Sequence, residues 1–243
     1  MNPAAHKVRS RVVDAWNKAL VGMQQMETAS SARPDSGWQV VELDAAVAND
    51  VIGLNFGPVV FNVPARANSG RTDLFVAMKG WIVFEGDLNV EPLKTRTFGT
   101  DIGYFQLKGG RLQHVYGAHY DMDEIRPGHP VFHAQMGAQM DLGLAVKDHF
   151  KLDCEIDQVM GRVLKNVRTP SAQMDVFAVL TQISADHLIG EAPPPEVKTA
   201  FSALRNASDF FVGAAHRLDY LNTPPATGCY RSKYWYDAPT ANA

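Results

Sequence analysis

The chain has 243 residues, of which 46% are hydrophobic and 20% are charged. This composition excludes an intrinsically disordered protein, because it supplies enough apolar surface to build a core. The 23 basic and 26 acidic residues leave a formal net charge of -3, so no overall positive field draws the protein to nucleic acid or anionic lipid. Nucleic acid stays open as a partner, but the net charge does not support it.

Cysteine usage and hydropathy bear on the compartment. Cys154 and Cys229 lie far apart and do not form a Cys-x-x-Cys pair, which argues against a disulfide scaffold or a thiolate zinc site. No apolar run reaches the ~18 residues that cross a bilayer, and polar residues interrupt the amino-terminal segment where a signal peptide would need an apolar core. We expect a cytoplasmic protein that does not bind membranes.

The amino-terminal half predicts one helix followed by strands. Apolar residues recur at spacings of three and four from about 6 to 26, as on one face of an amphipathic helix. The segment 28–37 is rich in Ser, Ala, Pro and Gly and predicts a connector. Short β-branched runs bounded by breakers then predict strands, over 38–43, 57–63, 74–78, 81–84, 98–107 and 111–120. We expect these strands to form an antiparallel meander.

Two dipeptides are predicted to be the turns of this meander, Lys79-Gly80 and Gly109-Gly110. A Gly-Gly turn fixes the hairpin register, because both residues accept the positive φ that a tight hairpin needs. Lys108 then lies opposite Arg111, and Phe105 lies opposite His114. Strict alternation from this register places Tyr116 on the face of His114, and His119 on the opposite face.

The carboxyl-terminal half predicts helices. Thr169-Pro170 is typical of a helix start, with the helix running to Leu188. A second apolar seam predicts a helix over 195–222, and an aromatic segment, 229–236, follows it. The predicted fold class is therefore α+β, with an N-terminal helix, an antiparallel β-meander and C-terminal helices packed on the sheet. We expect a single α+β domain over 1–243, in which 1–136 is helix plus sheet and 137–243 is mainly helical.

Histidines are concentrated in one part of the sequence, at positions 114, 119, 129, 133 and 149. Imidazole is the side chain suited to proton transfer and metal ligation near neutral pH. If residues 131–136 form a strand beside the preceding one, His133 and Gln135 share a face with His119 and Asp121. His129 precedes a proline and lies near the same rim.

Three interpretations of this cluster stay open. His119 and His133 can act as base and acid in phosphodiester cleavage, with Asp121 fixing a tautomer. A divalent metal at His119, His129 and His133 is a lesser alternative, so the predicted site has no cofactor and no metal. The histidines also fit purely structural roles in packing and turns. Gln135 and His129 are expected to help bind the substrate. Arg162 and Arg168 are expected to bind its phosphate beside a helix N-terminus.

Two segments, Gly128 to Gln135 and Val167 to Asp175, resemble stretches of uncharacterised bacterial proteins that carry a Gly-His-Pro-x-x-His-x-Gln sequence. The resemblance implies no activity. It implies a bacterial host, and it implies that the two segments lie near each other in the fold.

Two functions follow as hypotheses. The first is a cytoplasmic bacterial hydrolase that acts on a phosphodiester, in RNA or a nucleotide, through the His119 and His133 pair with Asp121. The second is a non-catalytic α+β subunit or adaptor that binds a partner protein, or a second copy of itself, through the 195–222 helix and the aromatic tail. An enzyme requires the imidazoles to converge, whereas an adaptor requires an exposed apolar patch.

Overall fold

The computed structural model describes residues 3–27, 33–35, 41–43, 51–63, 74–122, 130–137, 140–155, 167–190 and 192–212. The helical elements are α1 (Pro3–Glu27), α2 (Met140–Phe150), α4 (Val176–Ser184), the π-helix η1 (Ala185–Ile189) and α5 (Pro195–Asn206). The strands are β1 (Arg33–Asp35), β2 (Val41–Leu43), β3 (Val51–Val63), β4 (Leu74–Glu85), β5 (Leu93–Lys108), β6 (Arg111–Met122), β7 (Phe132–Met136), β8 (Cys154–Glu155), β9 (Arg168–Pro170) and β10 (Phe211–Val212). The predicted α+β class is confirmed.

The ten strands of the described ranges belong to one sheet, in which seven follow the order β1-β3-β4-β5-β6-β7-β9 and β2 pairs with β3. Strands β3 to β7 pair antiparallel with their neighbours along the chain, whereas β8 and β10 pair parallel with β6 and β5. β7 also pairs with β9, which places Gln135 opposite Arg168. The two segments that resemble bacterial sequences are therefore neighbours, as that resemblance implies.

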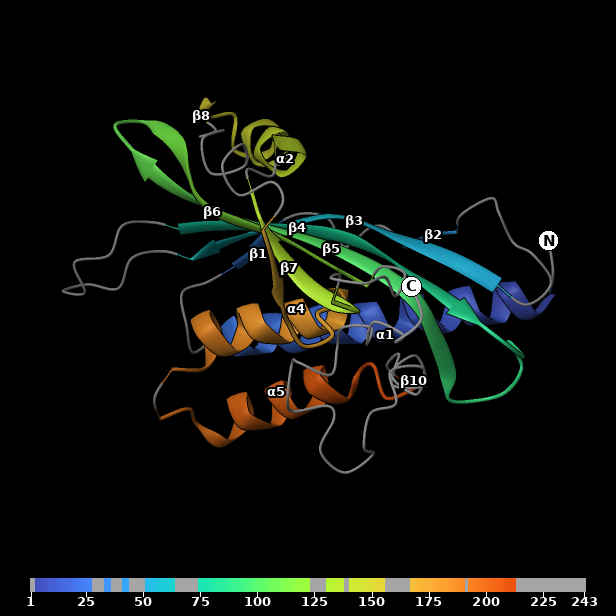
Figure 1. Cartoon of the computed structure of the whole chain (residues 1–243). Coiled ribbons are helices and arrows are strands. Elements are labelled where there is room, and N and C mark those ends of the chain that lie inside the picture. Colours follow the sequence, from blue (N-terminus) through green and yellow to red (C-terminus); the bar gives the residue numbers. More distant parts are fainter. Residues whose placement is uncertain are drawn as a thin grey trace, which may run out of the picture.

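Helices cover the two faces of the sheet unequally (Figure 1). α1 and α4 lie against one face, and α5 packs on these two helices from the side away from the sheet. Trp16 is buried on this face, with its ring centroid 4.9 Å from that of Phe56 and 5.4 Å from that of Phe177. α2 lies against the other face, where Leu142 and Val146 belong to a smaller buried cluster with strand residues. The amphipathic helix predicted over about 6 to 26 is confirmed as α1. None of the helices in the described ranges is long and apolar enough to cross a membrane.

β4 runs without a break through Lys79-Gly80, so the turn predicted there is wrong. Gly80 serves a close approach instead. A Cβ atom on Gly80 would lie 2.4 Å from the carbonyl oxygen of Gly99 and 2.6 Å from Cγ1 of Val176. Glycine in a strand interior often marks such a contact, and here it lets the start of α4 pack onto the middle of the sheet.

The Gly109-Gly110 turn is confirmed, with φ values of 60° and 77°. The predicted register also holds near the turn, where Lys108 lies opposite Arg111 and Phe105 lies opposite His114. It then shifts, because Tyr104 pairs with Tyr116. Val115 is thus an extra residue in β6, a β-bulge, and a bulge exchanges the faces of all residues beyond it.

This bulge corrects two predictions about β6. Tyr116 does not share a face with His114 but lies on the α4 face, opposite Tyr104. His119 lies opposite Asp101. Asp101 is four residues from Phe105 along β5, so the two share a face, and His119 therefore lies on the face of Phe105 and His114. The alternation that follows from the turn is sound only up to His114.

The carboxyl-terminal helices also differ from the prediction. Residues 168–170 form β9, and the helix begins six residues later, after Asp175, whose carboxylate accepts hydrogen bonds from the backbone N–H groups of Phe177 and Ala178. The helix predicted over 195–222 starts at Pro195, as expected, but ends at Asn206. Phe210 and Phe211 are buried, and Phe211 pairs with Leu93 at the start of β5. Burial of these two rings redirects the chain out of the helix.

Candidate functional site

The predicted histidine pair comes together in the structure. β6 and β7 place Asp121 opposite His133 and His119 opposite Gln135, while β5 places Asp101 opposite His119. Nδ1 of His119 lies 2.7 Å from Oδ1 of Asp101, and its Nε2 lies 3.2 Å from Oδ2 of Asp121. Nε2 of His133 lies 2.9 Å from the other oxygen of Asp121. We call these four side chains, Asp101, His119, Asp121 and His133, the histidine–carboxylate array.

The two imidazoles of the array differ in their access to solvent. The His119 side chain is 33% exposed, whereas the His133 side chain is only 2% exposed. A substrate in solution therefore has access to His119 and none to His133. Asp121 connects the two rings, so His133 can act only through Asp121.

The array fixes the charge of His119. Hydrogen bonds to Asp101 and then to Asp121 raise the pKa of His119 to about 9, although burial opposes this shift. Burial alone would raise the pKa of Asp121, but its hydrogen bonds with His119 and His133 outweigh burial and lower it. At neutral pH the array therefore holds an imidazolium between two carboxylates.

The remaining predicted site residues contribute less to the array. Gln135 is half-buried beside it, and Arg168 is exposed on β9 opposite Gln135. The helix N-terminus predicted beside Arg168 is not there, because residues 168–170 form β9 and α4 begins at Val176. Phosphate binding by Arg168 stays a prediction. His129 and Arg162 lie outside the described residues, as does the aromatic segment 229–236.

No part of the described chain brings together three or more His, Cys, Asp or Glu side chains in an arrangement that would hold a metal ion. Both ring nitrogens of His119 lie within hydrogen-bond distance of carboxylates, as an imidazolium requires. A metal ligand must instead present a bare nitrogen. The array as it stands is suited to holding a proton on His119.

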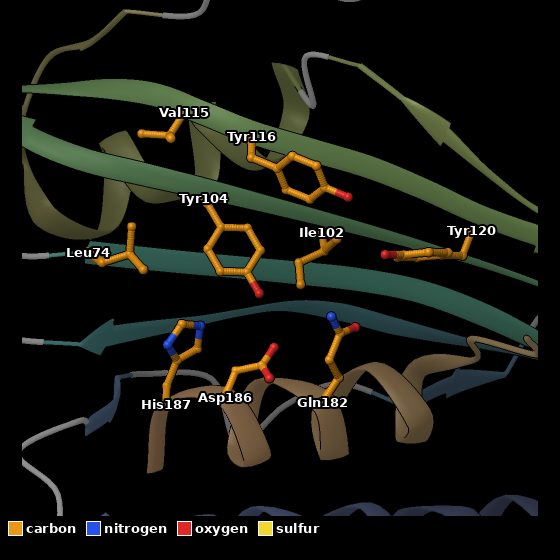
Figure 2. Close-up of a pocket in the computed structure, with 9 residues that line it drawn as sticks. All are labelled: Leu74, Ile102, Tyr104, Val115, Tyr116, Tyr120, Gln182, Asp186 and His187. Carbon is orange, nitrogen blue, oxygen red and sulfur yellow. The ribbon is translucent and has the colours of Figure 1, made fainter. Parts of the chain in front are cut away.

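A second candidate site lies on the opposite face of the sheet, in a pocket of about 440 Å³ between the strands and the α4–η1 helix. Figure 2 shows side chains from β4, β5 and β6 forming one wall, and three side chains of the helix pointing toward them. We call this the tyrosine pocket, and its described lining consists of Leu74, Ile102, Tyr104, Val115, Tyr116, Tyr120, Gln182, Asp186 and His187.

Aromatic rings gather in the tyrosine pocket. The Tyr104 centroid lies 5.8 Å from that of Tyr116 and 5.8 Å from that of the His187 imidazole. Tyr120 approaches from farther along β6, with its hydroxyl toward the centre of the pocket (Figure 2). The aliphatic side chains of Leu74, Ile102 and Val115 complete the apolar surface.

Polar groups from the helix face these rings. Asp186 and His187 belong to the π-helix η1, a type of element often found at functional sites. Burial, together with the charges of Asp186 and Tyr116, raises the pKa of Tyr104 to about 12. Burial, aided by Tyr116, also raises the pKa of Tyr120. The tyrosines therefore stay neutral and can both donate and accept hydrogen bonds.

The tyrosine pocket and Asp101 are absent from the site predicted by the sequence. Extending the Gly109-Gly110 register without a bulge would place Thr100, not Asp101, opposite His119. The same error places Tyr116 on the wrong face. Nothing in the composition of β6 distinguishes Val115 as a bulge residue, so the pocket had no local signal apart from the periodic tyrosines.

Comparisons of the chain with protein-family models, with curated protein sequences and with solved structures gave no match. The function must therefore be argued from the two sites themselves.

Proposed function

We propose that the protein binds a small organic molecule in the tyrosine pocket. The observation that carries this proposal is the composition of the pocket walls, which combine aromatic and aliphatic surface on the sheet side with convergent polar groups on η1. Small-molecule sites are concave, mostly apolar and equipped with a few oriented polar groups. The volume of about 440 Å³ falls within the range of such sites.

The position of the pocket also favours binding. Tyr104 belongs to β5, which pairs with β4 on one side and β6 on the other, and Tyr116 belongs to β6, which pairs with β5 at this position. Residues on such strands keep their geometry without a ligand, so little conformational entropy is lost when a ligand binds.

A screen of fragments tests this proposal. Ligand-observed NMR with cationic, neutral and anionic fragments of about 10 to 20 heavy atoms should identify binders that a Val115→Trp substitution displaces. Val115 lines the pocket and is 57% exposed, so a larger ring there obstructs the pocket at little cost to folding.

Val90→Trp is the matched control, because Val90 has the same 57% exposure and does not line the tyrosine pocket. Fragments should bind this variant as they bind the unchanged protein. If no fragment is displaced by Val115→Trp, the pocket is not a ligand site and the proposal fails.

A phosphodiester hydrolase acting through the array is our second candidate. The observation that favours it is the bridge formed by Asp121, whose two oxygens contact both predicted catalytic imidazoles. His119 would act as the general acid, since its raised pKa keeps it protonated at neutral pH. We rank it second because a phosphodiester approaching His119 also meets the negative charges of Asp101 and Asp121.

Bis(p-nitrophenyl) phosphate is a suitable probe for this second candidate. His119→Gln should abolish any hydrolysis, and His6→Gln should leave it unchanged, because His6 is exposed on α1. Hydrolysis that survives His119→Gln would assign the activity elsewhere. The adaptor hypothesis, with binding through the 195–222 helix and the aromatic tail, stays a prediction, and residues 213–243 are outside the described part of the chain.

A further inference from the structure

We infer that the ligand of the tyrosine pocket is an organic cation with N–H donors, an ammonium, amidinium or guanidinium group attached to an apolar body. This inference rests on the proposed function, and it specifies the ligand by its charge and its hydrogen-bonding groups.

The first argument is the charge of the pocket. Among its nine described lining residues, Asp186 is the one carboxylate, and none is Lys or Arg. Figure 2 shows the Asp186 side chain rising from the helix toward the hydroxyl of Tyr104. Asp186 is exposed at the edge of the pocket, so solvent screens its charge, but the carboxylate still attracts a cation and repels an anion.

The second argument is an acceptor without a donor. Oε1 of Gln182 is buried at the pocket wall and has no hydrogen-bond partner among the residues that the structure describes. A buried acceptor that lacks a donor destabilises the protein. Figure 2 places the end of this side chain level with Asp186, facing Ile102 and Tyr120. Oε1 of Gln182 is drawn on the side toward Tyr120. A cation with several N–H groups can offer one to this oxygen and another to the carboxylate of Asp186.

The third argument is the aromatic surround. The rings of Tyr104, Tyr116 and Tyr120 line the sheet side of the same space, and aromatic rings attract cations through their quadrupole. Their hydroxyl oxygens add further acceptors. Leu74 and Val115, at the end of the pocket beyond Tyr104, provide the apolar surface for the remainder of the ligand (Figure 2).

A set of probes matched in shape tests the inference. Dissociation constants are measured by NMR titration for phenethylammonium, phenethyl alcohol, phenylacetate and trimethyl(phenethyl)ammonium. The primary ammonium should bind at least ~10-fold more tightly than the alcohol, and phenylacetate should bind more weakly than either. Nα-acetyl-lysine methylamide is a fifth probe, which represents a lysine side chain of another protein. Comparing its dissociation constant with that of phenethylammonium distinguishes a protein lysine from a free amine as the ligand.

Two variants assign the effect to individual residues. Asp186→Asn should weaken phenethylammonium by about three- to fivefold and change the alcohol by less than about twofold. Asp148→Asn is the control for the change in net charge, because Asp148 is exposed on α2, on the other face of the sheet. Gln182→Leu should weaken the primary ammonium by about fivefold and leave the trimethylated probe unchanged, since that probe has no N–H donor.

The outcomes separate this inference from the proposed function. If fragments are displaced by Val115→Trp but the alcohol binds as tightly as the ammonium, the pocket binds ligands and the inference of a cation is overturned. The inference is also overturned if Asp186→Asn leaves the affinity for phenethylammonium unchanged. If Val115→Trp displaces no fragment of any charge, the proposed function itself fails.

Discussion

Tyr104 and Tyr116 lie opposite each other on β5 and β6, with their ring centroids 5.8 Å apart and their planes inclined at 60°. They meet only because Val115 is an extra residue in β6. The same residue returns His119 to the face that carries Asp101. One bulge thus produces both candidate sites, the tyrosine pocket on one face of the sheet and the histidine–carboxylate array on the other. Bulges near functional sites commonly redirect side chains in this way.

The raised pKa of Tyr104 should be measurable by absorbance titration at alkaline pH. Burial and the charge of Asp186 raise this pKa to about 12, compared with 10.0 for a free phenol. Subtracting the titration of Tyr104→Phe from that of the unchanged protein should leave a transition near 12. The folded state keeps a proton that the unfolded state loses, so Tyr104 also makes stability fall as pH rises above 10. A difference transition at pH 10 would show that Tyr104 is not buried beside Asp186.

The same bulge marks the limit of what the sequence can predict here. The Gly109-Gly110 turn determines the pairing from Lys108 to Phe105, because turn geometry fixes the register of a hairpin. Beyond His114 the pairing depends on how the side chains of β5 and β6 pack into the hydrophobic clusters on the two faces of the sheet. This packing is a tertiary effect. A shared face for His133 and Asp121 was predictable, since β7 is the next strand after β6 and both strands alternate.

Long-range packing accounts for the other errors. Gly80 resembles a turn residue, but α4, nearly a hundred positions later, requires a glycine there. The apolar seam that begins at Val197 continues in phase to Phe211. Phe211 does not extend α5, however, but packs on the sheet, where its ring centroid lies 5.3 Å from that of Phe84. Periodicity records which residues are buried and does not record against which partner.

The array should make stability depend on pH. Its hydrogen bonds raise the pKa of His119 from 6.5 to about 9, so the folded state gains stability that is complete below 6.5 and is lost as pH rises to about 9. His119→Gln should therefore destabilise the protein by about 1 to 2 kcal/mol at pH 6, after allowance for the exposed third of the side chain. Urea denaturation should show little difference between the two proteins at pH 10. An equal loss at both pH values would assign the effect to packing.

Asp175 should be important for the start of α4. Its buried carboxylate accepts hydrogen bonds from the N–H groups of Phe177 at 3.0 Å and Ala178 at 3.1 Å. Loss of such a cap typically costs about 1 to 2 kcal/mol, so Asp175→Ala should lower the urea midpoint. Asp175→Asn should cost less, because an amide oxygen still accepts and carries no charge to desolvate. Asp148→Ala, on the exposed face of α2, is the control and should change stability by less than about 0.5 kcal/mol. Equal losses for Asn and Ala would show that capping is not the role of Asp175.

Gly80 and Val176 should be energetically coupled. A Cβ atom at position 80 would lie 2.6 Å from Cγ1 of Val176 and 2.4 Å from the carbonyl oxygen of Gly99. Gly80→Ala should therefore destabilise the protein by about 1 to 3 kcal/mol, as overpacking does in other cores. Val176→Ala removes the first of these contacts and leaves the second. In a double-mutant cycle the combined variant should lose less stability than the two single losses added together, by about 1 kcal/mol. Additive losses would mean that α4 moves away from the sheet freely. Because η1 continues α4 and forms the polar wall of the tyrosine pocket, the width of that pocket would then not be fixed.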